Sequence, residues 1–206
     1  MPALTLYTNP MSRGTIAHWM MEEVAEPYET VWLDLATTAK TPDYLAINPM
    51  GKVPALVCDG QVVTEAAAIC AFMGDRFPEK GLAPAFDAPG RAAYVRWLFF
   101  AAGPLEQAIT AKAMGWEVPP GREGTVGFGT HQRTIDALQT ALEPGPFVCG
   151  EQFTAADVYV GSAVLWGLQF GTIEKRPVFE AYAQRLSARP AYQRYAAICA
   201  DRRAAG

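Results

Sequence analysis

The order of apolar and polar positions near the start of the chain predicts a strand, a helix and a second strand. Residues 3–7 alternate apolar and polar side chains, and residues 28–33 form another β-type run. Between them, Ser12 is a suitable N-cap for a helix that reaches Glu22-Glu23. The apolar residues of that helix recur at helical spacing: Ile16, Trp19, Met20 and Val24. This order predicts a βαβ unit with parallel strands.

A hairpin and another helix are predicted to follow. A short helix is expected from Thr41-Pro42 up to the turn residues Asn48-Pro49. The apolar run that Val53-Pro54 opens is separated from a second run by Asp59-Gly60, a typical two-residue hairpin turn. Residues 65–77 then show an Ala-rich helical pattern. The first part of the chain therefore reads β-α-β-α-β-β-α.

Two positions in this part suggest a binding site for a peptide-like ligand. Pro54 has no N–H, which suits a strand edge or kink, and the Val53-Pro54 bond is a candidate for the cis isomer. The helix that begins near Glu65 offers free N–H groups and a positive dipole end, which suit a carboxylate. Strand edge and helix start together predict a peptide-sized site.

The second part of the chain predicts helices only. A Pro- and Gly-rich segment over residues 77–90 separates it from the first part. We expect two domains, an α/β domain over residues 1–80 and an all-α domain over residues 86–206. The many Gly and Pro residues from Gly115 to Gly129 predict a mobile loop or lid. Helical patterns cover residues 91–114, 130–142, 154–170, 178–188 and 191–201.

One motif in the helical part predicts a helix start. Thr154 is followed three residues later by Asp157 and preceded by the apolar Phe153, as in a capping box with a hydrophobic staple. We interpret Asp157 as a structural residue and exclude it from the active site.

Composition and charge narrow the function classes. The 206 residues are 50% hydrophobic and carry a net charge of −4, which disfavours nucleic acid as a partner. Neither a signal peptide nor an apolar span long enough for a membrane is evident, so the expected location is the cytoplasm. The four cysteines lack metal-site or C-x-x-C spacing, so no metal is expected and the thiols read as reduced and mostly buried.

The motif N-P-M-G-K-V-P over residues 48–54, followed by a hairpin and an acidic residue at a helix start, resembles the glutathione-binding half of glutathione S-transferases. The resemblance covers essentially the full length and is to bacterial-type cytosolic members. It implies a thioredoxin-like N-terminal domain, here without the usual redox cysteines, and an all-α C-terminal domain. It also implies glutathione as co-substrate, a role in detoxification, and a homodimer in which the first domain of one subunit faces the helices of the other.

Such a transferase must lower the pKa of the glutathione thiol, because the thiolate is the nucleophile. A shift of two units from about 8.5 requires roughly 2.7 kcal/mol of preferential thiolate stabilisation. Ser12, at a predicted helix start, could donate to the sulfur, or it could be an ordinary N-cap. Because the hydroxyl of many serine-type relatives falls one or two residues earlier, Asn9, Tyr7 or a backbone N–H are alternatives. Arg13 is a further candidate, against a surface ion pair as the competing interpretation.

Five residues are assigned to glutathione binding by the resemblance. The Val53 backbone would pair with the cysteinyl moiety, and Pro54 would fix that edge. Glu65 would bind the γ-glutamyl ammonium, with helix capping as the alternative. Many relatives have Ser or Thr where this chain has Ala66, so the γ-glutamyl carboxylate would depend on the Ala66 N–H. Lys52 would pair with the glycyl carboxylate or remain a solvated loop charge.

The electrophile is expected in an apolar pocket between the two domains. Trp116 and Phe128 are the preferred lining residues because they flank the Gly/Pro-rich stretch, and Met114 and Tyr94 are further candidates. The two histidines, His18 and His131, have no matching nucleophile and are interpreted as core or surface residues.

The predicted function is conjugation of the glutathione thiolate to a small apolar electrophile. One alternative is another glutathione chemistry, namely isomerisation or reduction of peroxides and disulfides. The double Ser-Cys turn of isomerase relatives and a cysteine-type turn are both absent, because Met11 and Ser12 occupy that region. The other alternative is a non-catalytic binding or regulatory protein with the same fold.

Overall fold

A computed structural model describes residues 3–205 of the chain. Two compact units are distinguished by their internal contacts. The first comprises the described residues up to Lys80 and those from Ala188 onward, and the second comprises Gly81–Ser187.

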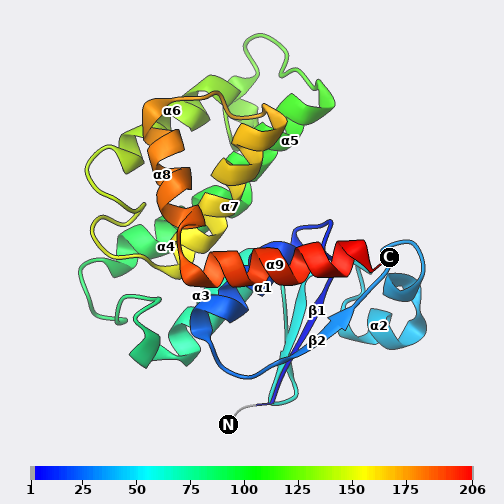
Figure 1. Cartoon of the computed structure of the whole chain (residues 1–206). Coiled ribbons are helices and arrows are strands. Elements are labelled where there is room, and N and C mark those ends of the chain that lie inside the picture. The colour runs from blue at the N-terminus through cyan, green and yellow to red at the C-terminus, as the bar shows by residue number, and fades with distance from the viewer. Residues whose placement is uncertain (1–2, 206) are drawn as a thin grey trace. The chain divides into compact units, whose positions relative to one another are not determined.

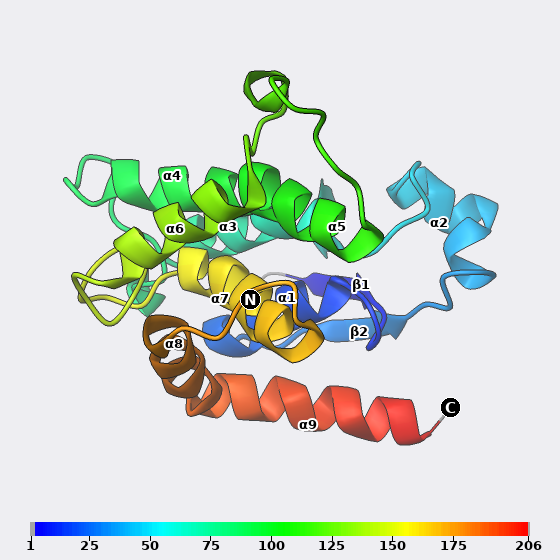
Figure 2. The same ribbon diagram turned by 90° about the horizontal axis from the view of Figure 1, so that it is seen from above.

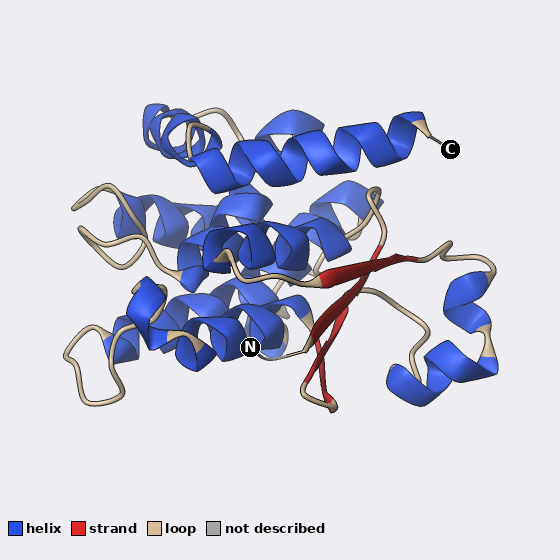
Figure 3. Ribbon diagram, turned by 60° about the horizontal axis from the view of Figure 1, so that its bottom comes forward, coloured by secondary structure: helices blue, strands red, loops and turns tan. Residues whose placement is uncertain are grey.

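The first unit contains one four-stranded mixed sheet, with the strand order β2-β1-β3-β4 (Figure 3). Its strands are β1 (Leu4–Thr8), β2 (Glu29–Trp32), β3 (Ala55–Cys58) and β4 (Gln61–Thr64). β1 pairs with β2 in parallel and with β3 antiparallel, and β3 pairs antiparallel with β4. Asp59 and Gly60 both have positive φ, 50° and 81°, as the tight turn between β3 and β4 requires. The predicted hairpin is therefore confirmed.

The first unit also contains helices, and those up to Lys80 follow the order that the sequence predicts. They are α1 (Gly14–Val24), η1 (Thr38–Lys40), α2 (Pro42–Ile47), α3 (Ala66–Arg76), η2 (Pro78–Lys80) and α9 (Pro190–Ala204). Up to Lys80 the order is β-α-β-α-β-β-α with short 3₁₀ turns added, which confirms the thioredoxin-like arrangement.

The two sheet faces have separate cores. Leu4, Leu6 and Thr8 alternate with partly buried residues along β1 and are buried on the side where α1 packs. On the other face, Tyr7 packs with Tyr44 of α2 in a small apolar cluster that includes Leu33, Ala39 and Ala55. Figure 2 shows α1 and α2 on either side of β1 and β2.

The C-terminal helix α9 packs along α1 and so belongs to the first unit (Figure 1). Arg189 donates two hydrogen bonds of 2.7 Å to the Glu23 carboxylate, and Arg194 binds Glu22. The aromatic rings of Tyr192 and Tyr195 pack against Trp19 of α1. This grouping differs from the expected division of the chain, in which residues 188–206 belong to the helical domain.

The second unit consists of helices joined by loops. They are α4 (Arg91–Phe100), η3 (Ala101–Leu105), α5 (Glu106–Met114), η4 (Glu123–Thr125), α6 (His131–Leu142), α7 (Ala155–Phe170) and α8 (Pro177–Ser187). The helical pattern predicted over residues 91–114 is confirmed, but the helix is not regular throughout. η3 is a π-helical segment that contains Pro104, whose missing N–H disrupts the regular hydrogen-bond ladder.

The predicted capping box of α7 is confirmed. Asp157 is fully buried and accepts hydrogen bonds from the backbone N–H groups of Thr154 and Val148 and from the Tyr182 hydroxyl, at 2.8–2.9 Å. Burial nevertheless raises the pKa of Asp157 above its usual value. Because all these partners belong to the second unit's own core, Asp157 has a structural role.

Candidate functional site

The register of the sheet brings three segments of the first unit to one end of it. Tyr7 and Thr64 both pair with Ala55, one from each neighbouring strand. The residues just after β1, just before β3 and just after β4 therefore lie at the same end of the sheet. The helices α1 and α3 also begin there, so two positive helix ends meet this region. We call residues 9–13 the first turn, and Val53, Pro54, Glu65 and Ala66 the open edge.

The corner before β3 leaves a stretch of backbone unpaired. The Val53-Pro54 peptide bond is cis, and no described residue forms a hydrogen bond with the Val53 backbone. The preceding carbonyl, that of Lys52, accepts from the Tyr44 hydroxyl at 2.6 Å and from the Asn48 side chain at 2.8 Å. The Val53 backbone is thus held in place by its neighbour while its own donor and acceptor stay available.

Glu65 lies at the start of α3 in an unusual backbone conformation. Its φ of 68° and ψ of 124° are rarely adopted by residues other than glycine and cost roughly 1–3 kcal/mol. The exposed side chain makes no capping hydrogen bond, and no described residue pairs with its carboxylate. Helix capping, the alternative interpretation of Glu65, is therefore wrong. Such strain is typical of ligand sites.

Ala66 is the first residue of α3 and is nearly buried. The first hydrogen bond that closes the helix runs from the Ile69 N–H to the Glu65 carbonyl at 2.9 Å. The N–H groups before Ile69 therefore have no partner within the helix. The Ala66 N–H is a donor at the positive end of α3, beside the free Glu65 carboxylate.

Ser12 uses its hydroxyl within the first turn. The hydroxyl donates to the Asn9 carbonyl at 2.9 Å and accepts from the Gly14 N–H at 3.0 Å. The helix itself begins at Gly14, with Arg13 at the N-cap position and no side-chain cap. Ser12 therefore performs a capping function one residue before the assigned N-cap. Its backbone N–H has no partner among the described residues.

Two side-chain alternatives to Ser12, Asn9 and Tyr7, are also occupied or turned away. The Asn9 side chain donates to the Leu33 carbonyl and accepts from the Met11 N–H, both at 2.8 Å. Tyr7 packs against Tyr44, at 5.6 Å between ring centroids, on the sheet face away from α1. Arg13 is exposed at the end of the turn. The turn is closed around its own hydrogen bonds.

Gly14 is required by a close approach behind the first turn. A Cβ atom at this position would lie 2.3 Å from Thr8 Oγ1 and 3.0 Å from Ser12 Oγ. Thr8 is fully buried, and its hydroxyl has no hydrogen-bond partner among the described residues. The strand end, the turn and the helix start are therefore packed too tightly for any side chain at position 14.

The protein thiols are unsuited to nucleophilic chemistry. Burial raises the pKa of Cys199 to about 11, and burial together with the Asp157 carboxylate raises the pKa of Cys149 to about 11. Cys70 is fully buried and its pKa is also raised. Cys58 is buried at the end of β3. The predicted burial of most of the cysteines is confirmed.

The second unit has an apolar cleft in the Gly/Pro-rich segment. It has a volume of about 570 Å³, and Trp116 and Phe128 line it together with Val118, Pro119 and Val126. Trp116 is 64% exposed. Met114 is exposed and not among the lining residues, while Tyr94 is fully buried in α4. The structure thus brings two of the four predicted pocket residues together.

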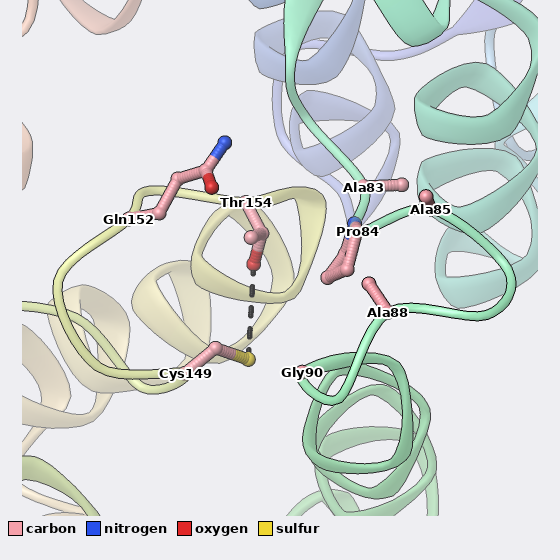
Figure 4. A pocket seen from close by; sticks show the side chains of 8 residues that line it. All are labelled: Ala83, Pro84, Ala85, Ala88, Gly90, Cys149, Gln152 and Thr154. Atoms are coloured by element: carbon pink, nitrogen blue, oxygen red, sulfur yellow. Dashed lines mark hydrogen bonds between the residues drawn. The ribbon is translucent and has the colours of Figure 1, made fainter.

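A second, smaller cleft in this unit lies between the segment from Ala83 to Gly90 and the loop before α7 (Figure 4). Its volume is about 370 Å³, and Cys149 and Thr154 face each other across 3.9 Å. Small side chains form the other wall. With a pKa of about 11, the Cys149 thiol is protonated at neutral pH. The cleft therefore does not resemble a catalytic cysteine site.

Within residues 3–205 no group of His, Cys, Asp or Glu side chains could hold a metal ion. No helix in the same range is long and apolar enough to cross a membrane. Lys52 is exposed beside the open edge. His18 is completely buried, as one interpretation of the sequence expected, and His131 bonds to the Thr172 carbonyl at 2.7 Å.

Sequence reasoning missed the groups that support the site. The sequence indicates Asn48 only as a turn residue, yet its side chain donates to the Lys52 carbonyl and accepts from the Met50 N–H. Asn before Pro is a common turn-forming pair whose side chain bonds to nearby backbone, so this role had a signal. Tyr44 and Thr8 lie in ordinary apolar patterns, and nothing in the sequence around them indicates that they support the site.

Comparisons with known proteins match both parts of the chain. Residues 12–76 match the family model described as glutathione S-transferase, N-terminal domain, and residues 126–190 match glutathione S-transferase, C-terminal domain. Glutathione S-transferase GstA of Escherichia coli O157:H7 is 27% identical over 92% of this chain and 96% of its own length. The disulfide-bond oxidoreductase YfcG of Escherichia coli K12 is 26% identical over 91% and 92% of the two chains.

Solved structures agree with these matches. A glutathione transferase from Methylococcus capsulatus aligns with a TM-score of 0.80 and 29% identity over 96% of this chain and 99% of that one. A sphingomonad glutathione S-transferase in complex with glutathione aligns with a TM-score of 0.78 and 28% identity, over 95% and 98% of the two chains.

Proposed function

Because the chain belongs to the glutathione S-transferase family, we propose that it conjugates the thiolate of glutathione to a small apolar electrophile. The observation that carries this proposal is the free Glu65 carboxylate, which is held in a strained conformation beside unpaired backbone donors. A protein without a ligand at this position would gain by relaxing Glu65 or by pairing its charge.

The open edge suits the parts of glutathione one by one. The Val53 N–H and C=O can pair with the cysteinyl backbone in the manner of an added strand, with Pro54 fixing the corner. Glu65 can accept from the γ-glutamyl ammonium, and the Ala66 N–H can donate to the neighbouring carboxylate. Lys52 can pair with the glycyl carboxylate. These assignments place the thiol at the sheet end where the first turn lies.

Thiol activation is assigned to the first turn, with Ser12 as the activating group. Its hydroxyl proton points to the Asn9 carbonyl, so donation to sulfur requires exchange of one hydrogen bond for another. A charged acceptor makes a stronger bond than a neutral one, which favours the exchange once the thiolate forms. The unpaired Ser12 N–H and the N-terminus of α1 would add to the field.

The electrophile is assigned to the cleft that Trp116 and Phe128 line. Its volume of about 570 Å³ falls within the range of small-molecule sites, and most of its walls are apolar. We also propose that the protein acts as a cytoplasmic homodimer, as the family resemblance implies.

The test is an ultraviolet titration of bound glutathione across pH, because the thiolate absorbs and the thiol does not. We expect the bound thiol to ionise about two units below its free pKa of about 8.5, and Ser12→Ala to remove much of that shift. Ser187→Ala, which removes a hydroxyl from the second unit, serves as the matched control. A shift that survives Ser12→Ala would move the role to the backbone. Absence of binding or of any shift would support a non-catalytic binding protein.

Reduction of disulfides or peroxides by glutathione is a second candidate function. The similarity to the disulfide-bond oxidoreductase YfcG favours it. Bound glutathione would supply the attacking thiol, since the protein thiols have raised pKa values or are buried. Turnover of a generic aromatic halide compared with that of a small disulfide in the presence of glutathione separates the two functions.

A further inference from the structure

The C-terminal helix α9 runs antiparallel to α1 and is fixed to it at successive levels. Near the start of α9, Arg189 binds Glu23, and Arg194 then binds the Glu22 side chain at 2.9 Å and its carbonyl at 2.8 Å. Glu23 has a largely buried carboxylate, 4% exposed, so its bidentate pair with Arg189 is shielded from solvent. These contacts fix the end of α1 that is far from the first turn.

A buried contact fixes the middle of the pair. Cys199 Sγ lies 3.7 Å from His18 Nδ1, and both residues are at most 1% exposed. Tyr195, Tyr28 and Trp32 surround the imidazole ring. A close-packed contact of this kind defines the position of α9 along α1, because a slip by one residue would bury mismatched groups.

Beyond this contact, the C-terminal end of α9 reaches residues 9–13, the first turn. Arg203 Nη1 donates to the Pro10 carbonyl at 3.2 Å. The same peptide group ends in the Met11 N–H, which donates to Asn9 Oδ1 at 2.8 Å. The Pro10-Met11 peptide is therefore held at both ends, by α9 on one side and by the turn on the other.

From this geometry we propose that Arg203 is a positioning residue for thiol activation, and the proposal rests on the proposed function. Its guanidinium fixes the peptide plane in the middle of the turn that carries Asn9 and Ser12. A cation on the carbonyl also polarises the peptide, which strengthens the hydrogen bond that its N–H donates. The orientation of the Ser12 hydroxyl, and with it the thiol pKa, then depends on a residue almost two hundred positions away in sequence.

The neighbouring Arg202 offers a matched control. It is also in the last turn of α9, but its guanidinium lies over the Trp32 ring, 5.9 Å from the centroid. Arg202→Gln and Arg203→Gln remove the same charge from the same helix end. Only Arg203→Gln removes the hydrogen bond to the first turn, so a difference between the two variants reports that bond.

The first measurement is amide hydrogen exchange of the whole ligand-free protein. We expect Arg203→Gln to speed exchange at the Met11 amide by about fivefold, which corresponds to the loss of one ordinary hydrogen bond. Arg202→Gln should leave that amide unchanged, and Arg203→Lys should restore part of its protection. Equal exchange in the two glutamine variants would overturn the positioning role, whatever the protein does with glutathione.

The second measurement is the pKa of the bound glutathione thiol in the same variants. We expect a rise of about half a unit in Arg203→Gln, with little change in glutathione affinity, and no rise in Arg202→Gln. If the wild-type thiol shows no shift, the proposed function fails while the exchange result still decides the role of Arg203 in the turn. If the wild-type thiol is shifted and both variants match it, the positioning role is overturned.

Discussion

In the first turn, the side chains of Asn9 and Ser12 are already hydrogen bonded within the protein, whereas the open edge leaves Val53, Glu65 and Ala66 unpaired. The edge can therefore accept a ligand without rearrangement, and its strain at Glu65 is already present in the free protein. The turn has to exchange bonds before it can act on a thiol. We therefore propose that affinity for glutathione is set at the edge and thiol activation at the turn.

The largest expected effect comes from removing the free charge of the edge. Glu65→Gln keeps the side-chain shape but loses a charge-assisted hydrogen bond, so we expect glutathione to bind about 10- to 100-fold more weakly. Calorimetric titration with glutathione measures this. Glu29→Gln makes the same charge change at the exposed start of β2, at the opposite end of the sheet, and should bind normally. Equal weakening in both variants would contradict a specific contact.

The next effect concerns the tight packing behind the turn. In Gly14→Ala the new Cβ would meet Thr8 Oγ1 at 2.3 Å, and we expect a loss of about 2 kcal/mol in the free energy of unfolding. Urea denaturation measures it. Gly103→Ala is the control, because a Cβ there meets no atom within 4 Å and should be neutral or stabilising. Adding Thr8→Ala should restore part of the Gly14→Ala loss, and no restoration would mean that Thr8 is not the obstacle.

A smaller effect is a loss of stability in acid that arises from His18 in α1, the helix that follows the first turn. Burial lowers the pKa of His18 below 6.5, outweighing the opposite influence of Glu22. Below about pH 6.5 the unfolded chain binds a proton that the folded protein does not, so stability is complete above that pH and falls as the solution is acidified. We expect the free energy of unfolding to fall between pH 6.5 and pH 5.5, by at most about 1 kcal/mol.

Urea unfolding at pH 7.5, 6.5 and 5.5 measures this loss. His18→Phe should flatten the dependence, and His131→Gln should leave it in place. The same slope in wild type and His18→Phe would show that another group is responsible.

The smallest effect is a gain. Ala66→Ser adds a hydroxyl at the first position of α3, where it can donate to the γ-glutamyl carboxylate, and we expect glutathione to bind about threefold more tightly. Ala68→Ser is the control, because Ala68 lies two residues further along α3 and its side chain is exposed. If Ala66→Ser binds no better, the carboxylate of the ligand does not lie at the N-terminus of α3.

The open edge was predictable from the sequence because its geometry is local. Asp59-Gly60 determines the hairpin, whose register pairs Ala55 with Thr64. Val53-Pro54, just before Ala55, and Glu65, just after Thr64, therefore lie at the same end of the hairpin. The sequence makes Val53-Pro54 a candidate for the cis isomer, which the structure confirms, but it cannot establish that state. It gives no sign of the strained conformation of Glu65, because that conformation depends on packing around the corner.

The environment of Ser12 and the partner of α9 could not be predicted for a different reason. Whether a serine hydroxyl caps a helix or faces a ligand depends on the path of a five-residue turn. The apolar pattern of residues 191–201 predicts a helix but does not say which unit it covers. The choice rests on long-range pairs such as Arg189 with Glu23, which no sequence periodicity reveals.

The Ala66 N–H has a consequence for the tolerance of the site to mutation. A donor that belongs to the main chain is kept by nineteen of the twenty residue types, so random substitution at position 66 changes the neighbourhood of the ligand but rarely removes the donor. Proline is the exception, and the first position of a helix is where proline is best tolerated. Selection on the carboxylate contact would therefore be visible at position 66 chiefly as the exclusion of proline.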